Sequence, residues 1–353
     1  MEHRSIRAKG TRVAVTPAKA ERVAAARAAP VVRSVVVDAG SVGQRLDNFL
    51  AKTLKGVPKT HLYRVIRSGE VRVNKGRAAA DTRLDLGDEI RIPPVRVADR
   101  SEVAPAPPRE FPVVYEDEHL MAIDKPSGVA VHGGSGESFG VIEQLRRARP
   151  AAEFLELVHR LDKETSGLLL IAKTRKALVG LQNDLRSRTP ERAIGKTYAA
   201  LVVGEWPERA KVIDVALHKY LDADGGRRVR VVEADNADGR RAITLVRVGE
   251  RYVGFTLLDV TIKTGRTHQI RVHLTHEGHA IAGDPKYGDF ALNKALARGA
   301  TVPGVRFDRM FLHARRLRFV HPATGVAVDI EAPLPPACTA LLDALAAASI
   351  LHI

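Results

Sequence analysis

The 353-residue sequence has little of what marks a secreted or membrane protein. Cysteine occurs once, at Cys338, which excludes an intramolecular disulfide. We also find no secretory h-region and no apolar run of about 18 residues. A chain of this length can bury a full core without covalent staples and has room for about two domains. We therefore expect a cytoplasmic protein without membrane contact.

Acidic residues are scarce at the front of the chain. The formal charge is +15, of which residues 1–33 carry +6, residues 34–97 carry +5 and the remaining residues +4. The first segment is rich in Ala and Arg and lacks aromatic residues, so we predict a disordered basic arm. Glu2 and Glu21 argue against an organellar transit peptide. A basic front is typical of polyanion binders, although a plain basic surface would give the same count.

A compact unit is expected over residues 34–97. Apolar side chains recur at helical spacing from Leu46 to Leu54 and again from Leu62 to Ile66. Thr60 is the expected N-cap of the second helix. Alternating apolar residues then indicate a strand that reaches a turn at Lys75-Gly76.

The stretch Thr60–Asn74 resembles an S4-type RNA-binding domain, in which two helices present a basic face to folded RNA. A solvated helix surface is the alternative interpretation. The resemblance implies four RNA-binding cations, which are Lys59, Arg64, Arg67 and Lys75.

A second, larger domain is predicted over residues 111–353, after a proline-containing linker at 98–110. Its patterns favour an α+β domain over regular βαβ units. We expect strands at 113–115, 120–123, 168–172, 198–203 and 252–260, and helices near 138–148, 177–187 and 267–277.

The strongest chemical signal is the segment Leu157–Lys173, LVHRLDKETSGLLLIAK, where a polar stretch runs into an apolar strand. We expect Gly167 to mark the turn between them. A carboxylate held at such a junction, here Asp162, can face a cleft as a nucleophile or general base. The alternative is a side chain that only caps a turn through the amides of Thr165 or Ser166.

This segment is similar to the H-R-L-D-x-x-T-S-G signature of the RluA/RluC/RluD-type pseudouridine synthases. Three further motifs follow the family's order, at 124–132, 196–202 and 263–273. Residues 130–143 are most similar to the RluC branch, which modifies 23S ribosomal RNA. The resemblance implies an α+β catalytic domain with a mixed, largely antiparallel sheet and flanking helices. It also implies isomerisation of uridines to pseudouridine in large-subunit ribosomal RNA.

The resemblance implies three catalytic residues: Asp162, Tyr198 and Arg271. The reaction breaks the N1–C1′ bond, turns the uracil and rejoins it through C5, so we expect no cofactor and no metal. The carboxylate could attack C1′, stabilise charge there or add at C6, and the sequence does not choose among these. Arg271 would hold Asp162 by a bidentate pair. A phosphate contact is the alternative for Arg271, and Arg266 is the rival for the pairing role.

Several neighbours are expected to touch the RNA. Tyr198 can pack against the uracil while its hydroxyl assists proton removal at C5, or it can be a core tyrosine. A uridine in a stem must leave the stack to react, and Arg160 could fill the vacated space or form a structural ion pair. His159 and Arg266 complete the predicted RNA-binding residues of this site.

Other functions are less well supported by the sequence. A glycosidase needs two facing carboxylates, and neither Glu156 nor Glu164 is evidently paired with Asp162. His273, His276 and His279 recur every three residues, but no cysteine or carboxylate completes a zinc site. The remaining alternatives are a non-catalytic RNA-binding or ribosome-assembly protein, or a synthase of the same family that acts on other RNA sites. We expect a monomer with no obligatory protein partner.

Overall fold

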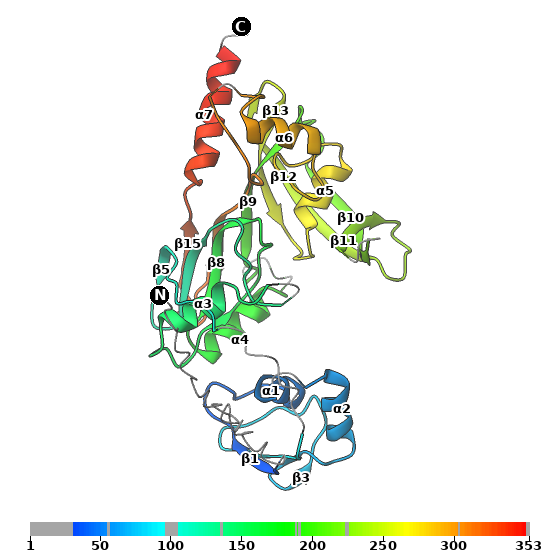
Figure 1. Cartoon of the computed structure of the whole chain (residues 1–353), viewed down its shortest axis with the longest axis vertical. Coiled ribbons are helices and arrows are strands. Elements are labelled where there is room, and N and C mark those ends of the chain that lie inside the picture. The colour runs from blue at the N-terminus through cyan, green and yellow to red at the C-terminus, as the bar shows by residue number, and fades with distance from the viewer. Residues whose placement is uncertain are drawn as a thin grey trace, which may run out of the picture. The chain divides into compact units, whose positions relative to one another are not determined.

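The computed structural model describes residues 31–54, 57–95, 105–134, 137–187, 189, 192–222, 226–302 and 304–350. These residues divide into two compact units, which are drawn in Figure 1. Residues 38–42 group with the larger unit, which otherwise follows the smaller one in the chain. Most of the predicted arm and part of the predicted linker lie outside the described residues. The arm, the linker and the domain boundaries therefore stay predictions.

The smaller unit combines two helices with an antiparallel four-stranded sheet in the order β1-β4-β2-β3. The helices bury the apolar faces that their spacing predicts, including Phe49 on the first and Val65 on the second. The elements are β1 (Arg33–Val36), α1 (Leu46–Thr53), α2 (Lys59–Arg67), β2 (Arg72–Val73), β3 (Gly76–Arg77) and β4 (Glu89–Ile92).

Two local predictions in the smaller unit are wrong. The N-cap of α2 is Pro58, so Thr60 lies inside the first helical turn. Proline at this boundary fits because its fixed φ suits a helix start and the lost N–H had no helical partner. The hairpin turn falls at Asn74-Lys75, one residue earlier than expected, and both residues have positive φ. That pair of left-handed residues is typical of a type I′ turn, which the strand twist favours.

The described part of the larger unit forms a long mixed sheet in the order β11-β10-β12-β13-β9-β14-β8-β6-β5. Two short strands extend it, β15 beside β14 and β7 beside β8. The strands are β5 (Val113–Glu116), β6 (Leu120–Lys125), β7 (Glu156–Leu157), β8 (Ser166–Ala172), β9 (Gly195–Val203), β10 (Val212–Leu221), β11 (Arg227–Val232), β12 (Arg240–Tyr252), β13 (Phe255–Ile262), β14 (Leu312–Val320) and β15 (Ala327–Glu331).

Helices flank this sheet, as Figure 1 shows. Alternating residues of β6 point to opposite faces: Met121 and Ile123 join one core, and Leu120 and Ala122 join the other. The first core includes α3, the second includes α4, and α5 packs against β10, β11 and β12. The helices are α3 (Val141–Ala148), α4 (Arg175–Asp184), α5 (Gln269–His276), α6 (Phe290–Arg298) and α7 (Pro336–Ile350).

The centre of the sheet explains the glycine of the HRLD segment. Among the described strands, β8 and β14 form the one parallel pair, with Gly167 opposite Ala314. A Cβ on Gly167 would lie 2.3 Å from the carbonyl oxygen of Ala314. Gly167 has φ +106° and lies within β8, so the prediction that it marks the turn is wrong. It is required because two backbones meet there.

The predicted α+β class, with a largely antiparallel sheet and flanking helices, is confirmed. The single strand expected over 252–260 is wrong, because a turn at Val253-Gly254 separates β12 from β13. The sequence analysis did not predict the strands β7, β10, β11, β14 and β15, most of β12, or the helices α6 and α7. No described helix has the length and apolar character needed to cross a membrane.

Candidate active site

Asp162 lies in the tight turn that leads into β8. The carbonyl oxygen of Asp162 accepts the N–H of Thr165, which closes the turn. The carboxylate itself faces Nη1 of Arg271 at 3.5 Å and Nε2 of His268 at 4.0 Å. The Asp162 side chain is 20% exposed, so the group is held by the turn yet open to solvent. This arrangement suits a reactive carboxylate better than a capping one.

The end of β6 and the segment that follows it also fix the Asp162 turn. Nζ of Lys125 donates to the carbonyl oxygens of Pro126, Val129 and Lys163, and the last of these belongs to the turn. The N–H of Gly128 also donates to the Lys163 carbonyl oxygen. Burial lowers the pKa of Lys125 to about 7. The motif at 124–132 therefore positions the turn, a role that its sequence did not reveal.

Arg271, on α5, connects Asp162 to a second and more deeply buried carboxylate. Its Nε and Nη2 both donate to Asp284 at 2.7 Å, so the bidentate partner is Asp284 and the predicted bidentate pair with Asp162 is wrong. Burial alone would lower the pKa of Arg271, but the hydrogen bonds that Arg271 donates to Asp284, together with the charge of that carboxylate, outweigh it and raise the pKa. The cation is therefore permanent, with Nη1 left free to face Asp162.

Asp284 is held as firmly as Arg271. It is fully buried, and its Oδ1 also accepts the backbone N–H groups of Lys286 and Tyr287. These hydrogen bonds keep the pKa of Asp284 below its usual range although burial acts to raise it. Gly283 precedes it with φ +76°, where a Cβ would lie 1.9 Å from the Arg309 carbonyl oxygen. A glycine is thus needed to place this carboxylate.

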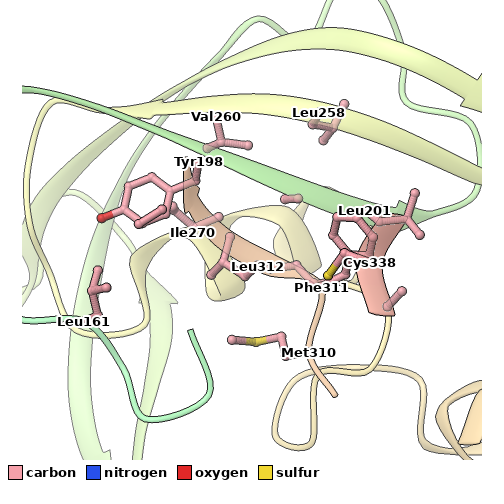
Figure 2. Packing of buried hydrophobic residues seen from close by; sticks show 14 of the residues in the cluster. Leu161, Tyr198, Leu201, Leu258, Val260, Ile270, Met310, Phe311, Leu312 and Cys338 are labelled. Carbon is pink, nitrogen blue, oxygen red and sulfur yellow. The ribbon is translucent and has the colours of Figure 1, made fainter. Parts of the chain in front are cut away.

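Tyr198, on β9, forms an apolar wall of the same site. Figure 2 shows its ring beside Ile270 and Leu312, with the hydroxyl turned toward the side of Leu161. All four residues line one cavity together with Asp162. Burial, followed by the nearby charge of Asp162, raises the pKa of Tyr198. The hydroxyl is therefore uncharged at neutral pH, which leaves both predicted roles open.

His268 is a site residue that sequence reasoning missed. It precedes α5 with φ +52°, and among the described residues of the larger unit it is the one non-glycine residue at positive φ. Its Nδ1 lies 2.8 Å from the Tyr287 hydroxyl. Burial lowers the pKa of His268 to about 4, against the opposing charge of Asp162. No sequence pattern signals this conformation.

The cavity has a volume of about 330 Å³, at the lower end of the range for small-ligand pockets. Two more of the predicted RNA-binding residues, Arg160 and Arg266, also line it. Arg160 is exposed, and Arg266 lines the cavity with its Nε 3.4 Å from the Arg241 carbonyl oxygen. Lys196 was missed: it lines the cavity, and burial lowers its pKa.

His159 has a different environment from the one expected of an RNA ligand. Its Nε2 accepts the backbone N–H of Leu170, although the ring also lines the cavity. Burial lowers the pKa of His159 to about 3, so the ring is neutral. We infer that it mainly orients the chain before Asp162.

The three regularly spaced histidines have separate environments. His273 is fully buried, His276 is exposed, and Nδ1 of His279 lies 2.9 Å from the Val203 carbonyl oxygen. Within the described ranges, no group of three His, Cys, Asp or Glu side chains could hold a metal ion.

The predicted cations of the smaller unit are all exposed. Three of them project from α2, whereas Lys75 lies at the β2–β3 turn. Lys75 lines a shallow cavity with Arg72 and Arg91, two cations that the sequence analysis did not single out. The cations of the sheet share this cavity with the acidic Glu89.

Comparison with known proteins identifies both units. Residues 44–90 match the S4 domain, and residues 119–276 match the RNA pseudouridylate synthase family. The ribosomal large subunit pseudouridine synthase C of Salmonella typhimurium is 48% identical over 90% of this chain and 97% of its own length. The protein of that name from Escherichia coli K12 is 49% identical over 86% of this chain and 94% of its own.

A solved structure agrees with the fold. Human RNA pseudouridylate synthase domain containing 4 is 26% identical, covers 67% of this chain and 93% of its own, and superposes with a TM-score of 0.53. The chain belongs to the RNA pseudouridylate synthase family and carries an S4 domain. It is an RNA pseudouridine synthase.

Proposed function

We propose that this enzyme isomerises selected uridines in the RNA of the large ribosomal subunit, and that Asp162 is its catalytic carboxylate. The substrate is supported by the names of two relatives, both ribosomal large subunit pseudouridine synthase C, which share nearly half of their residues with this chain over most of their length. The carboxylate is supported by one observation above others: Asp162 is the acidic side chain of the cavity, and it faces the fixed cation of Arg271. The proposal keeps the predicted monomer and cytoplasmic location.

Arg271 is proposed to orient Asp162. A single Nη1 contact at 3.5 Å leaves the carboxylate able to move toward the ribose or the base during the reaction. The bidentate bond to Asp284 prevents Arg271 from following that movement. The positive charge of Arg271 therefore stays in one place while Asp162 moves toward the substrate.

Tyr198 is proposed to support the uracil after the nucleotide leaves the stack. Its buried ring and the neighbouring Ile270 and Leu312 offer an apolar surface of the kind that bases prefer. Unstacking costs a few kcal/mol, which contacts inside the cavity must offset. Arg160 and Lys196, at the rim and wall, are proposed to contact the phosphates of the turned-out nucleotide.

Mapping of pseudouridines in ribosomal RNA tests the substrate. Cells that lack this gene should lose a small set of pseudouridines from the large-subunit RNA, and the wild-type gene should restore them. An Asp162→Asn gene should restore none. An unchanged large-subunit pattern with losses in transfer RNA would assign the enzyme to a different substrate.

A further inference from the structure

The imidazole of His268 enters the cavity beside Asp162 from a strained position. Left-handed backbone is unfavourable for a non-glycine residue, and such strain persists where the surroundings enforce it. Here the surroundings are the Tyr287 hydroxyl and α5, which begins at the next residue. The side chain is 16% exposed, and its Nε2 lies 4.0 Å from Oδ2 of Asp162.

From the hydrogen bonds of Tyr287 we infer which nitrogen of His268 carries the proton. The Tyr287 oxygen already accepts the N–H of Val229 at 3.0 Å. Its own proton is satisfied when the hydroxyl donates to Nδ1 of His268, 2.8 Å away. The neutral imidazole then bears its hydrogen on Nε2, the atom that faces Asp162. The cavity therefore holds a neutral donor next to the carboxylate, in addition to the Arg271 cation.

We propose that His268 is a further catalytic residue, whose Nε2–H donates a hydrogen bond to the uracil oxygen next to the glycosidic bond. This inference rests on the proposed function of Asp162. A carboxylate that acts at C1′ or C6 lies close to the bond between N1 and C1′. The uracil oxygen nearest to that bond is O2, and Nε2 is placed beside the same carboxylate.

The chemistry gives this donor a use in both halves of the reaction. When the N1–C1′ bond breaks, its electron pair stays on the uracil and the charge spreads to O2 and O4. The base then turns about its N3···C6 axis, which exchanges N1 with C5 and also O2 with O4. When C5 bonds to C1′, the C5 proton leaves and N1 gains one, so the composition is unchanged. O4 now occupies the position of O2, where the same Nε2–H serves it.

A neutral donor suits this task better than a charged one. His268 transfers no proton and only stabilises charge on the uracil oxygen. The charges of Asp162, Arg271, Asp284 and Lys286 act on its ring, Tyr287 is its hydrogen-bond partner, and burial keeps its pKa near 4 in their presence. The neutral ring therefore does not protonate the detached uracil, which would stop the reaction before C5 bonds to C1′.

Paired substitutions at His268 test the proposal. Asn accepts left-handed backbone and can still meet Tyr287, but it is too short to place a donor at Nε2. Gln reaches the Nε2 position with its amide. The exposed His276 at the far end of α5 gives the matched control, His276→Asn.

The substrate is an RNA fragment with one target uridine, taken from whichever RNA the wild-type enzyme modifies. We expect His268→Asn to slow single turnover by about 10²-fold with unchanged RNA affinity. His268→Gln should recover at least about tenfold of that loss, and His276→Asn should match wild type. Because sulfur accepts hydrogen bonds weakly, 2-thiouridine at the target should shrink the gap between wild type and His268→Asn to about threefold or less.

Three outcomes would overturn the proposal. A His268→Asn enzyme with the wild-type rate removes the role altogether. A gap that is equally large with 2-thiouridine refutes the contact with O2. If the rate difference between wild type and His268→Asn disappears with 2′-deoxyuridine at the target instead, His268 contacts the ribose and not the uracil. Failure of the proposed substrate would show differently, because the fragment that the wild-type enzyme modifies would then come from another RNA.

Discussion

Replacing Asp284 tests how the site holds its cation. Asp284 is fully buried, and four hydrogen bonds converge on its carboxylate, two from Arg271 and two from backbone N–H groups. Three of these end on Oδ1, and only Nε of Arg271 ends on Oδ2. In Asp284→Asn the amide oxygen can replace Oδ1 and keep its three hydrogen bonds. The NH₂ group then replaces Oδ2 and faces Nε of Arg271, so two donors meet and that hydrogen bond is lost. In Asp284→Ala all four donors lose their acceptor.

The expected loss of stability follows from the burial of Asp284. Removing one partner of a buried ion pair costs about 3–5 kcal/mol, because the other charge stays behind without compensation. We expect that loss for Asp284→Ala. For Asp284→Asn we expect a loss of about 2–3 kcal/mol in the free energy of unfolding, because one charged hydrogen bond and the negative charge are removed. Both variants should also slow turnover, because Arg271 loses the anchor that fixes Nη1 opposite Asp162.

Asp329 provides the matched control. It also accepts a bidentate arginine, Arg316, and a third bond from Arg318, but its side chain is 43% exposed. Asp329→Ala should therefore cost less than about 1 kcal/mol. The single tryptophan, Trp206, is buried in the larger unit, so its fluorescence during urea unfolding reports on that unit. Equal losses for Asp284→Ala and Asp329→Ala would refute the reasoning.

Three further results are expected. Burial lowers the pKa values of His273 and His313 to about 4, so between pH 6.5 and pH 4.5 the unfolded chain binds protons that the folded chain does not. The stability measured with Trp206 should therefore fall with decreasing pH by roughly 1.4 kcal/mol per pH unit for each histidine, and a constant value from pH 7 to pH 5.5 would contradict this. Tyr198→Phe keeps the packing surface, so RNA affinity should hold within about twofold while loss of the C5 proton slows. Single turnover on RNA deuterated at C5 should then show an isotope effect, and a wild-type rate without one would leave Tyr198 as a packing surface. Changing the three predicted RNA-binding cations of α2 to Gln should reduce the slope of log affinity against log salt by about 0.7–0.9 for each lost phosphate contact, whereas an unchanged slope would exclude α2 from the interface.

Much of the fold was predictable because local patterns and burial agree. The helices of the smaller unit and the strands β6 and β8 carry apolar residues at the spacing that their faces require. The strand expected at 252–260 covers most of β13 but only the last residue of β12, because Arg247, Gly249 and Glu250 interrupt the apolar pattern of β12. β14 was missed because Arg315, Arg316 and Arg318 give it the polarity of a loop. Their ion pairs with β15 and β13 are visible only once the strands are paired.

The site was predictable in part for a different reason. A family motif contains residues whose chemistry the reaction requires, so Asp162, Tyr198 and Arg271 could be chosen from the sequence. All three line one cavity. Asp284 and His268 depend on partners distant in sequence and on backbone conformation. Neither a buried bidentate bond nor a left-handed φ leaves a pattern in one sequence. The carboxylate that orients Arg271 and the proposed hydrogen-bond donor beside Asp162 were therefore missed.

The most direct test of the account is tritium release from large-subunit ribosomal RNA labelled at uridine C5, compared between wild type and Asp162→Asn. Asn keeps the shape of the side chain and removes its charge. One carboxylate contributes little to RNA affinity beside many cations, so binding should be nearly unchanged. The account predicts multiple-turnover release by the wild-type enzyme and none above background by Asp162→Asn. Multiple turnover by the purified Asn variant would contradict it.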